Sequence, residues 1–222
     1  TIDTTPMIAT IKAGETISVT SKNTREKGQI ILDKTGVETG SDLWNDNYSL
    51  VGNTFAIRKD SPTGEIVQEM TTDEDGHAET PKEIANALDL GTYYVTETKA
   101  SNGFVNTFKP VKVELKYASQ TVALVTNNVK GQNQEITGET TLTKEDKDTG
   151  DKTQGKAVFE CAEYTLFTAK DGKVVKWTED FKPELVKGTK ASDETVTLTL
   201  DEKNQVAVKH LAINEYYWQE TK

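Results

Sequence analysis

Three residues in the first half of the chain carry side chains that could together form a covalent cross-link. Lys34 supplies an amine, Asn127 a primary amide and Glu97 a carboxyl group. Side chains two residues apart on a β-strand point to the same face, so an alternating apolar run directs the residue that extends it toward the core. Each of the three extends such a run: Ile30 and Leu32 precede Lys34, Tyr93 and Val95 precede Glu97, and Ala123 and Val125 precede Asn127.

Burial would change the chemistry of these groups, because a low-dielectric interior disfavours charge. It lowers the pKa of a lysine and raises the pKa of a glutamate. A neutral Lys34 amine could attack the side-chain amide of Asn127 while Glu97 polarises the carbonyl and shuttles protons. Ammonia would leave and an amide cross-link would remain. The reaction would occur once per chain, so these residues predict no enzymatic turnover.

Two alternatives stay open at this point. Asn128 adjoins Asn127, and a register shift of one residue would exchange their faces, although the strand phase favours Asn127 as the acceptor. The simpler alternative is a surface salt bridge between Lys34 and Glu97 with an unrelated turn asparagine. The parity of all three positions favours the cross-link.

The elements that would hold these groups are short β-strands. Apolar residues alternate with polar ones, and Thr, Val, Ile and Tyr dominate those stretches, so the fold is predicted to be all-β. Gly, Asn, Asp and Pro mark turns between them. The predicted strands include residues 16–19, 29–32, 54–57, 93–96, 111–117, 122–125, 164–167, 195–200 and 206–208.

The same series of motifs occurs twice, which predicts two tandem modules. Lys144, followed by Thr149-Gly150, repeats the first lysine, and Glu220 repeats the first glutamate. We expect a complete module at residues 26–133 and a second at 134–222 that lacks its last strands. Residues 1–25 would be the closing strand of an upstream module.

Composition excludes several classes of function. The chain has 222 residues, 34% hydrophobic and 28% charged, and a formal net charge of −10. Such an acidic chain repels phosphate backbones, so nucleic acid is not an expected partner. No apolar run approaches the roughly 18 to 20 residues of a membrane span. A single cysteine, Cys161, cannot form an internal disulfide.

Other candidate sites have weaker support, and no metal or cofactor is expected. The acidic clusters at 73–76 and 146–150 lack the trailing glutamate of a calcium loop and are typical of turns. His77 and His210 have no third ligand at zinc spacing. Cys161 is predicted to pack as a small apolar residue. Trp44 and Trp177, in predicted loops, are the best candidates for contact with a partner.

The chain resembles the Cna B-type, or SpaA-type prealbumin-like, domains of Gram-positive surface adhesins and pilins. The shared pattern is Ile30-x-Leu32-x-Lys34 before Thr-Gly, Tyr93-x-Val95-x-Glu97-Thr, and a closing Val125-Thr126-Asn127. In that family a lysine and an asparagine form an isopeptide bond aided by an acidic residue. The resemblance therefore implies the same roles for Lys34, Asn127 and Glu97. It also implies them for Lys144 and Glu220 in the second module and an acceptor role for Asn23 in an upstream module, with the partners of these three residues outside this sequence. The turn after Glu97 lacks the proline usual in the family.

The resemblance implies tandem Ig-like β-sandwiches that form a stalk of a cell-wall-anchored, extracellular adhesin or pilus-type protein. Neighbouring modules of the same polypeptide would be its partners. The alternative is a ligand-binding adhesin module that recognises a host extracellular-matrix or cell-surface protein or glycan, most plausibly through the loop at 177–181. A polymerising pilin is a third hypothesis, with no convincing sortase motif.

Overall fold

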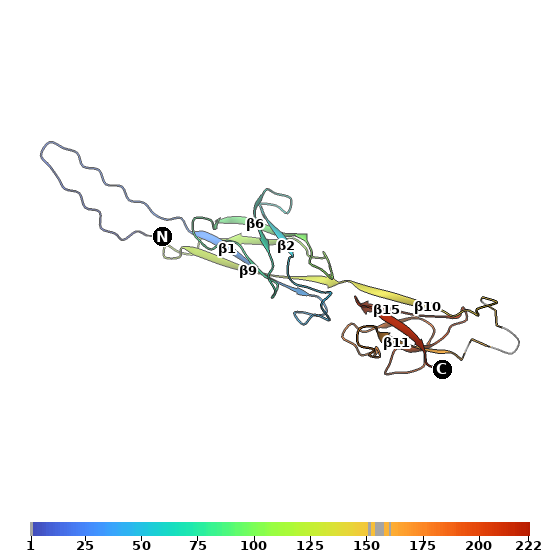
Figure 1. The fold of residues 1–222 in the computed structure, drawn as a ribbon. Coiled ribbons are helices and arrows are strands. Elements are labelled where there is room, and N and C mark those ends of the chain that lie inside the picture. The colour runs from blue at the N-terminus through green and yellow to red at the C-terminus, as the bar shows by residue number, and fades with distance from the viewer. Residues whose placement is uncertain (1, 151, 154–157, 160) are drawn as a thin grey trace. The chain divides into compact units, whose positions relative to one another are not determined.

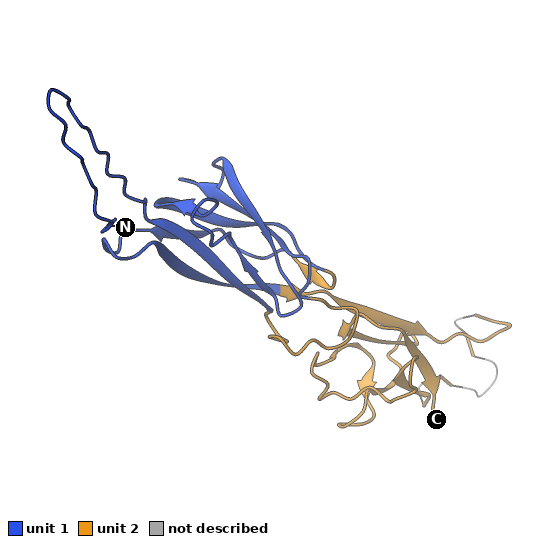
Figure 2. Ribbon diagram, turned by 60° about the vertical axis from the view of Figure 1, so that its left-hand side comes forward, with its two compact units in different colours: residues 1–35, 50–101, 106–133 blue, residues 36–49, 102–105, 134–222 orange. Residues whose placement is uncertain are grey.

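The computed structural model confirms the all-β prediction. It describes residues 2–150, 152–153, 158–159 and 161–222, which form 16 strands and no helix (Figure 1). Accordingly, the described part of the chain contains no apolar helix long enough to span a bilayer. Two compact units are present: residues 1–35, 50–101 and 106–133 make unit 1, and residues 36–49, 102–105 and 134–222 make unit 2 (Figure 2).

Unit 1 is a sandwich of two sheets. One has the order β3-β2-β6-β8; in the other, β1 lies between β4 and β9 and also pairs with β5. Because β-branched and aromatic residues alternate along these strands, each sheet turns one apolar face toward the other. The strands are β1 (Lys27–Gly36), β2 (Thr54–Lys59), β3 (Ile66–Thr71), β4 (His77–Glu79), β5 (Leu88–Asp89), β6 (Gly91–Lys99), β8 (Val111–Leu115) and β9 (Leu124–Glu135).

The core of unit 1 fills the space between the two sheets. Ile30 and Leu32 of β1 are fully buried, as are Phe55 and Ile57 of β2 and Val95 of β6. They belong to a single apolar cluster with side chains from β3, β4, β5, β8 and β9. The alternation read from the sequence thus sets which side chains face inward.

Unit 2 contains two further sheets, with orders β10-β15-β12 and β13-β14-β11-β16. A second apolar cluster includes Leu166, Val196, Leu198, Val206 and Val208. The strands are β10 (Thr137–Thr143), β11 (Glu163–Thr168), β12 (Glu184–Lys187), β13 (Thr189–Lys190), β14 (Thr197–Thr199), β15 (Gln205–Ala212) and β16 (Tyr216–Glu220); β7 (Phe104–Val105) pairs with the end of β9.

Strand β9 is longer than the sequence pattern predicted, and it runs in the same direction as β1. Near its start the N–H of Lys27 donates to the carbonyl of Ala123, and farther along Gly131 lies against the side chain of Lys34. Past Asn128 the buried positions are Val129, Gly131, Asn133 and Glu135. Because three of those four are not apolar, the hydrophobic alternation fades although the strand continues.

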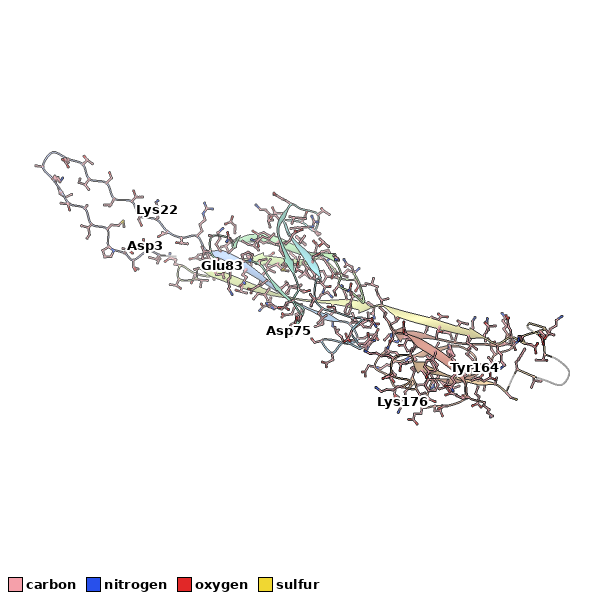
Figure 3. All side chains as sticks on the ribbon, in the orientation of Figure 1. Asp3, Lys22, Asp75, Glu83, Tyr164 and Lys176 are labelled. Atoms are coloured by element: carbon pink, nitrogen blue, oxygen red, sulfur yellow. The ribbon has the colours of Figure 1, made fainter. Side chains whose placement is uncertain are left out.

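The predicted strand at residues 16–19 is wrong. No strand occurs between residues 2 and 26, and that segment is exposed apart from its last residue; Asp3 and Lys22 are labelled on it in Figure 3. Ile17 and Val19 are 38% and 51% exposed. Alternation favours a strand only where a neighbouring strand supplies hydrogen bonds, and none in the described chain pairs with this segment.

Candidate functional site

Lys34 is buried at the end of the apolar face of β1. Only 1% of the residue is exposed, although lysine is rarely buried without a partner. Its amine donates to the carbonyl of Thr35 at 3.3 Å. A Cβ atom built on Gly131 of β9 would lie 3.3 Å from Lys34 Cδ, so the glycine leaves room for the lysine stem.

Asn133 lies two residues beyond Gly131 on the inward face of β9 and is completely buried. Its amide nitrogen Nδ2 donates to both carboxylate oxygens of Glu97, at 2.7 Å to Oε1 and 3.0 Å to Oε2. Glu97 is near the end of β6, on the face that also presents Tyr93 and Val95. The facing sheets of the sandwich therefore bring a carboxyl group from one sheet to an amide from the other.

Burial raises the pKa of Glu97 above its ordinary value. The hydrogen bond from Asn133 and the charge of Lys34 both act in the opposite direction but do not overcome desolvation. The Lys34 stem lies against Gly131, which is two residues before Asn133 on the same face of β9. Lys34, Glu97 and Asn133 thus form one cluster inside unit 1, called here the buried triad.

The structure does not bring Asn127 to this cluster. Asn127 points to the same face of β9 and is half-buried, but it precedes Asn133 by six residues, roughly 20 Å of extended strand. Asn128 is exposed on the other face. The predicted strand ended where its apolar residues ended, so the pattern located the inward face of β9 but not the residue on it that meets Glu97.

A signal for Asn133 is present in the repeat. Asn23 precedes Lys34 by 11 residues, and Asn133 precedes Lys144 by the same 11. Asn23 was singled out as an acceptor at the end of a module, and transferring its spacing to the next repeat selects Asn133 over Asn127.

A short segment between β7 and β8, residues 106–108, covers the buried triad and is called here the strap. Asn106 Nδ2 donates to the main-chain oxygen of Glu97 at 3.3 Å. The N–H of Thr107 donates to Asn133 Oδ1 at 3.2 Å. The ring of Phe108 packs edge-on against Phe55, with centroids 5.3 Å apart. The strap thus contacts both sheets of the sandwich.

The repeated residues in unit 2 also meet, but in a different setting. Lys144 Nζ donates to both carboxylate oxygens of Glu220 at 2.7 Å, and the hydroxyl of Tyr164, labelled in Figure 3, donates to Glu220 at 3.0 Å. The side chains of Lys144 and Glu220 are 24% and 45% exposed. The lysine lowers the pKa of Glu220, and the carboxylate raises the pKa of Lys144.

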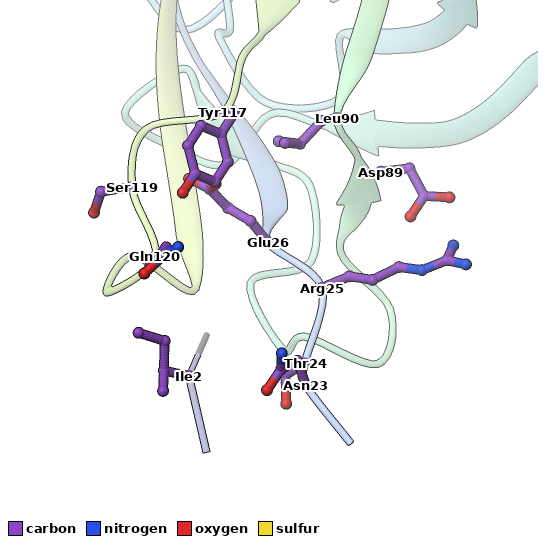
Figure 4. Close-up of a pocket in the computed structure, with 10 residues that line it drawn as sticks. All are labelled: Ile2, Asn23, Thr24, Arg25, Glu26, Asp89, Leu90, Tyr117, Ser119 and Gln120. Atoms are coloured by element: carbon purple, nitrogen blue, oxygen red, sulfur yellow. The ribbon is translucent and has the colours of Figure 1, made fainter. Parts of the chain in front are cut away.

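Asn23, the predicted acceptor of an upstream module, is not a member of the buried triad. It lines a cavity of about 560 Å³ in unit 1, together with its neighbours Thr24, Arg25 and Glu26 (Figure 4). Ile2 and Tyr117 line the same cavity. No lysine lines it among the described residues.

The remaining candidates are accounted for by local contacts. His77 pairs with Asp33 at 2.9 Å, and His210 with Glu38 at 3.1 Å. No group of metal-binding side chains occurs among the described residues. Cys161 is exposed, so its predicted packing as a small apolar residue is wrong; it lies in a turn.

The two loop tryptophans are engaged within unit 2. The ring of Trp44 meets those of Tyr48 and Phe181 edge-on, at 5.2 and 5.9 Å. Trp177 donates its indole N–H to Ser192 at 2.9 Å, and Lys190 lies 4.0 Å from its ring. Trp177 and Phe181 also pack against the apolar cluster of unit 2.

The topology and the buried triad can now be set beside known proteins. Residues 28–130 match the model of the SpaA prealbumin-like fold domain. The resemblance predicted from the sequence is confirmed over that region. No curated protein matches the chain.

Among solved structures, the Bacillus anthracis TIE protein is 24% identical, with a TM-score of 0.55; the match covers 89% of this chain and 29% of that one. This likeness supports the same fold. A streptococcal ancillary pilin is 19% identical over 88% of this chain and 54% of its own, with a TM-score of 0.37. The major pilin SpaD of Corynebacterium diphtheriae is 20% identical, and the match covers 85% of this chain and 52% of that one, with a TM-score of 0.36. The chain thus spans about a third to a half of these proteins.

Proposed function

We propose that this chain is a stalk segment of a Gram-positive surface adhesin or pilus-type protein, and that an isopeptide bond between Lys34 and Asn133 stabilises unit 1. The observation that carries the proposal is the buried triad, in which the reactive groups come from the first and last strands of one sandwich. The match to the prealbumin-like domain adds support.

The chemistry follows from burial. A buried amine favours its neutral, nucleophilic form. Lys34 Nζ forms a bond to Cγ of Asn133, and the bond from Cγ to Nδ2 breaks. The amine loses one proton and the departing nitrogen gains one, so the products are an amide and ammonia. Glu97 contacts Nδ2 and carries the proton between the two nitrogens. The reaction consumes its own residues and happens once.

Such a bond suits a mechanical role. It would close a loop of roughly 100 residues, which by analogy with a disulfide adds about 4 to 5 kcal/mol of stability. Tension that enters along β1 and leaves along β9 would pass through the cross-link. The strands between residues 34 and 133 would then bear little of the load.

Location and partners follow from the same proposal. The protein would be exported and held at the cell wall by regions outside these residues, with neighbouring modules as its covalent partners. Ligand recognition through loops, the alternative from the sequence, has less support because Trp44, Trp177 and Phe181 are packed within unit 2.

Single-molecule stretching of the chain by its two ends tests the stalk role. In the wild-type chain we expect residues 134–222 to extend and residues 34–133 to stay closed. In Asn133→Ala those residues should also extend, which adds roughly 330 Å of contour length. Release of that length from the wild-type chain would overturn the proposal.

A further inference from the structure

The nitrogen and the oxygen of the Asn133 side-chain amide contact two different groups. The nitrogen Nδ2 faces the Glu97 carboxylate, whereas the oxygen Oδ1 faces the main-chain N–H of Thr107 at 3.2 Å. A main-chain N–H can only donate a hydrogen bond, so it must face the amide oxygen. The orientation is therefore fixed from both ends, and the carboxyl group does not contact the oxygen that the sequence expected it to polarise.

These separate contacts matter because Oδ1 and Nδ2 need different partners when an amine attacks Cγ. Negative charge develops on Oδ1 as Cγ becomes tetrahedral, and Nδ2 must then gain a proton in order to leave. A donor at the oxygen and a proton carrier at the nitrogen are both needed, and a single carboxyl group at the nitrogen supplies only the second.

We propose that the main-chain N–H of Thr107 is a catalytic group of the cross-linking reaction, which stabilises the charge on Asn133 Oδ1. The inference rests on the proposed isopeptide bond and adds to it the group that activates the acceptor. Thr107, and not Glu97 as the sequence predicted, polarises the Asn133 carbonyl. Glu97 transfers the proton to Nδ2.

The strap holds this N–H in place. Asn106 on one side is tied to the main chain of Glu97 at 3.3 Å. Phe108 on the other side packs beside Gly131 and against Phe55. A donor whose position is set before the reaction costs no reorganisation as charge develops, and the apolar ring beside it limits access of water to the site.

The test replaces the Thr107 N–H by an ester oxygen, through an α-hydroxy acid at position 107. The ester retains the side chain and the shape of the strap but has no donor. The chain is held unfolded in denaturant and then diluted into buffer. The loss of one ammonia over time is measured from the intact mass of the chain. Removing one such donor is expected to slow the reaction by about 10² to 10³-fold. Thr107→Ala, which retains the N–H, is the matched comparison and should react much faster than the ester.

A second readout does not depend on the reaction. In the unreactive Lys34→Met chain, the ester should raise the infrared stretching frequency of the isotope-labelled Asn133 side-chain carbonyl, because the hydrogen bond that weakens that bond is gone. Thr107→Ala should leave the frequency unchanged. An ester chain that cross-links as fast as a reactive wild type, or shows an unshifted carbonyl, overturns the role of Thr107. A wild-type chain that never loses ammonia instead overturns the proposed function.

Discussion

The two units place the same pair of residue types in opposite environments. In unit 1, Lys34 is 1% exposed, and Glu97 contacts a completely buried amide. In unit 2, Lys144 and Glu220 form a half-exposed ion pair, with Tyr164 as the third member. Burial raises the pKa of Glu97, whereas the lysine lowers the pKa of Glu220. A lysine and a glutamate are thus an ion pair in one setting and candidate reactants in the other.

The largest expected difference between the units is the effect of replacing the glutamate on the rate of ammonia loss. Glu97→Gln removes the proton carrier and should slow loss of ammonia from refolding chain by about 10² to 10⁴-fold. Glu220→Gln is the matched change in unit 2, and the intact mass should follow the wild-type time course. Equal effects of the two substitutions would contradict the distinction between the clusters.

Replacing the two lysines should also have different effects on the unfolding free energy of their units. Lys34→Met prevents the cross-link, so unit 1 should lose about 4 to 5 kcal/mol of unfolding free energy by the loop-closure argument. Lys144→Met removes a half-exposed ion pair, which is worth about 0.2 to 1 kcal/mol. Hydrogen exchange of the core amides of each unit during denaturant titration measures both values. A loss below about 1 kcal/mol in both variants would count against a covalent bond in unit 1.

Two glycines sharpen the comparison at the level of packing. A Cβ on Gly131 would lie 2.5 Å from Phe108 Cε2, so Gly131→Ala should displace the strap and cost about 1 to 3 kcal/mol. On β10, a Cβ on Gly138 meets nothing within 4 Å, so Gly138→Ala is the control and should leave stability nearly unchanged. Chemical denaturation measures both changes. The account is wrong about the strap if Gly131→Ala also unfolds and cross-links like the wild type.

The smallest expected effect is an opposite response to pH. In the uncross-linked Lys34→Met chain, burial still raises the pKa of Glu97 in the folded state. As pH rises, the Glu97 carboxyl group therefore ionises at a lower pH in the unfolded chain than in the folded one. Unit 1 should therefore lose stability as pH rises above about 4.5, the ordinary value. The pKa of Glu220 is lowered, so unit 2 should lose that contribution as pH falls below about 4.5.

Thermal unfolding of each unit between acid and neutral pH, followed by hydrogen exchange, would show the two trends. Adding Glu97→Gln to Lys34→Met should remove the trend in unit 1, and Glu220→Gln should remove the one in unit 2. Trends of the same sign in both units, or trends that survive these substitutions, would contradict the assigned environments.

The sequence predicted the environment of the lysine and the acid better than that of the amide. Ile30 and Leu32 mark the inward face of β1 up to Lys34, and the same parity places Glu97 on the inward face of β6. Asn133 was missed because Gly131 precedes it where an apolar residue would have signalled the face. That glycine is needed for space beside Lys34 and Phe108, which depends on packing between strands far apart in sequence.

Two other failures have the same origin. Residues 16–19 alternate like a strand yet form none, because pairing depends on a neighbour that local pattern does not reveal. The role of Thr107 could not be predicted, since it uses a main-chain N–H that every residue except proline carries. Local periodicity therefore gave the fold class and most of the core, whereas tertiary contacts determine the third member of the triad.

We propose that Lys34 is joined to Asn133 and not to Asn127. The most direct test is the intact mass, under denaturing conditions, of the wild-type chain, Asn127→Ala and Asn133→Ala. We expect the wild type and Asn127→Ala each to weigh one ammonia less than their sequences, and Asn133→Ala to have its full calculated mass. A wild type at full mass, or an Asn133→Ala chain that still loses ammonia, would contradict the account.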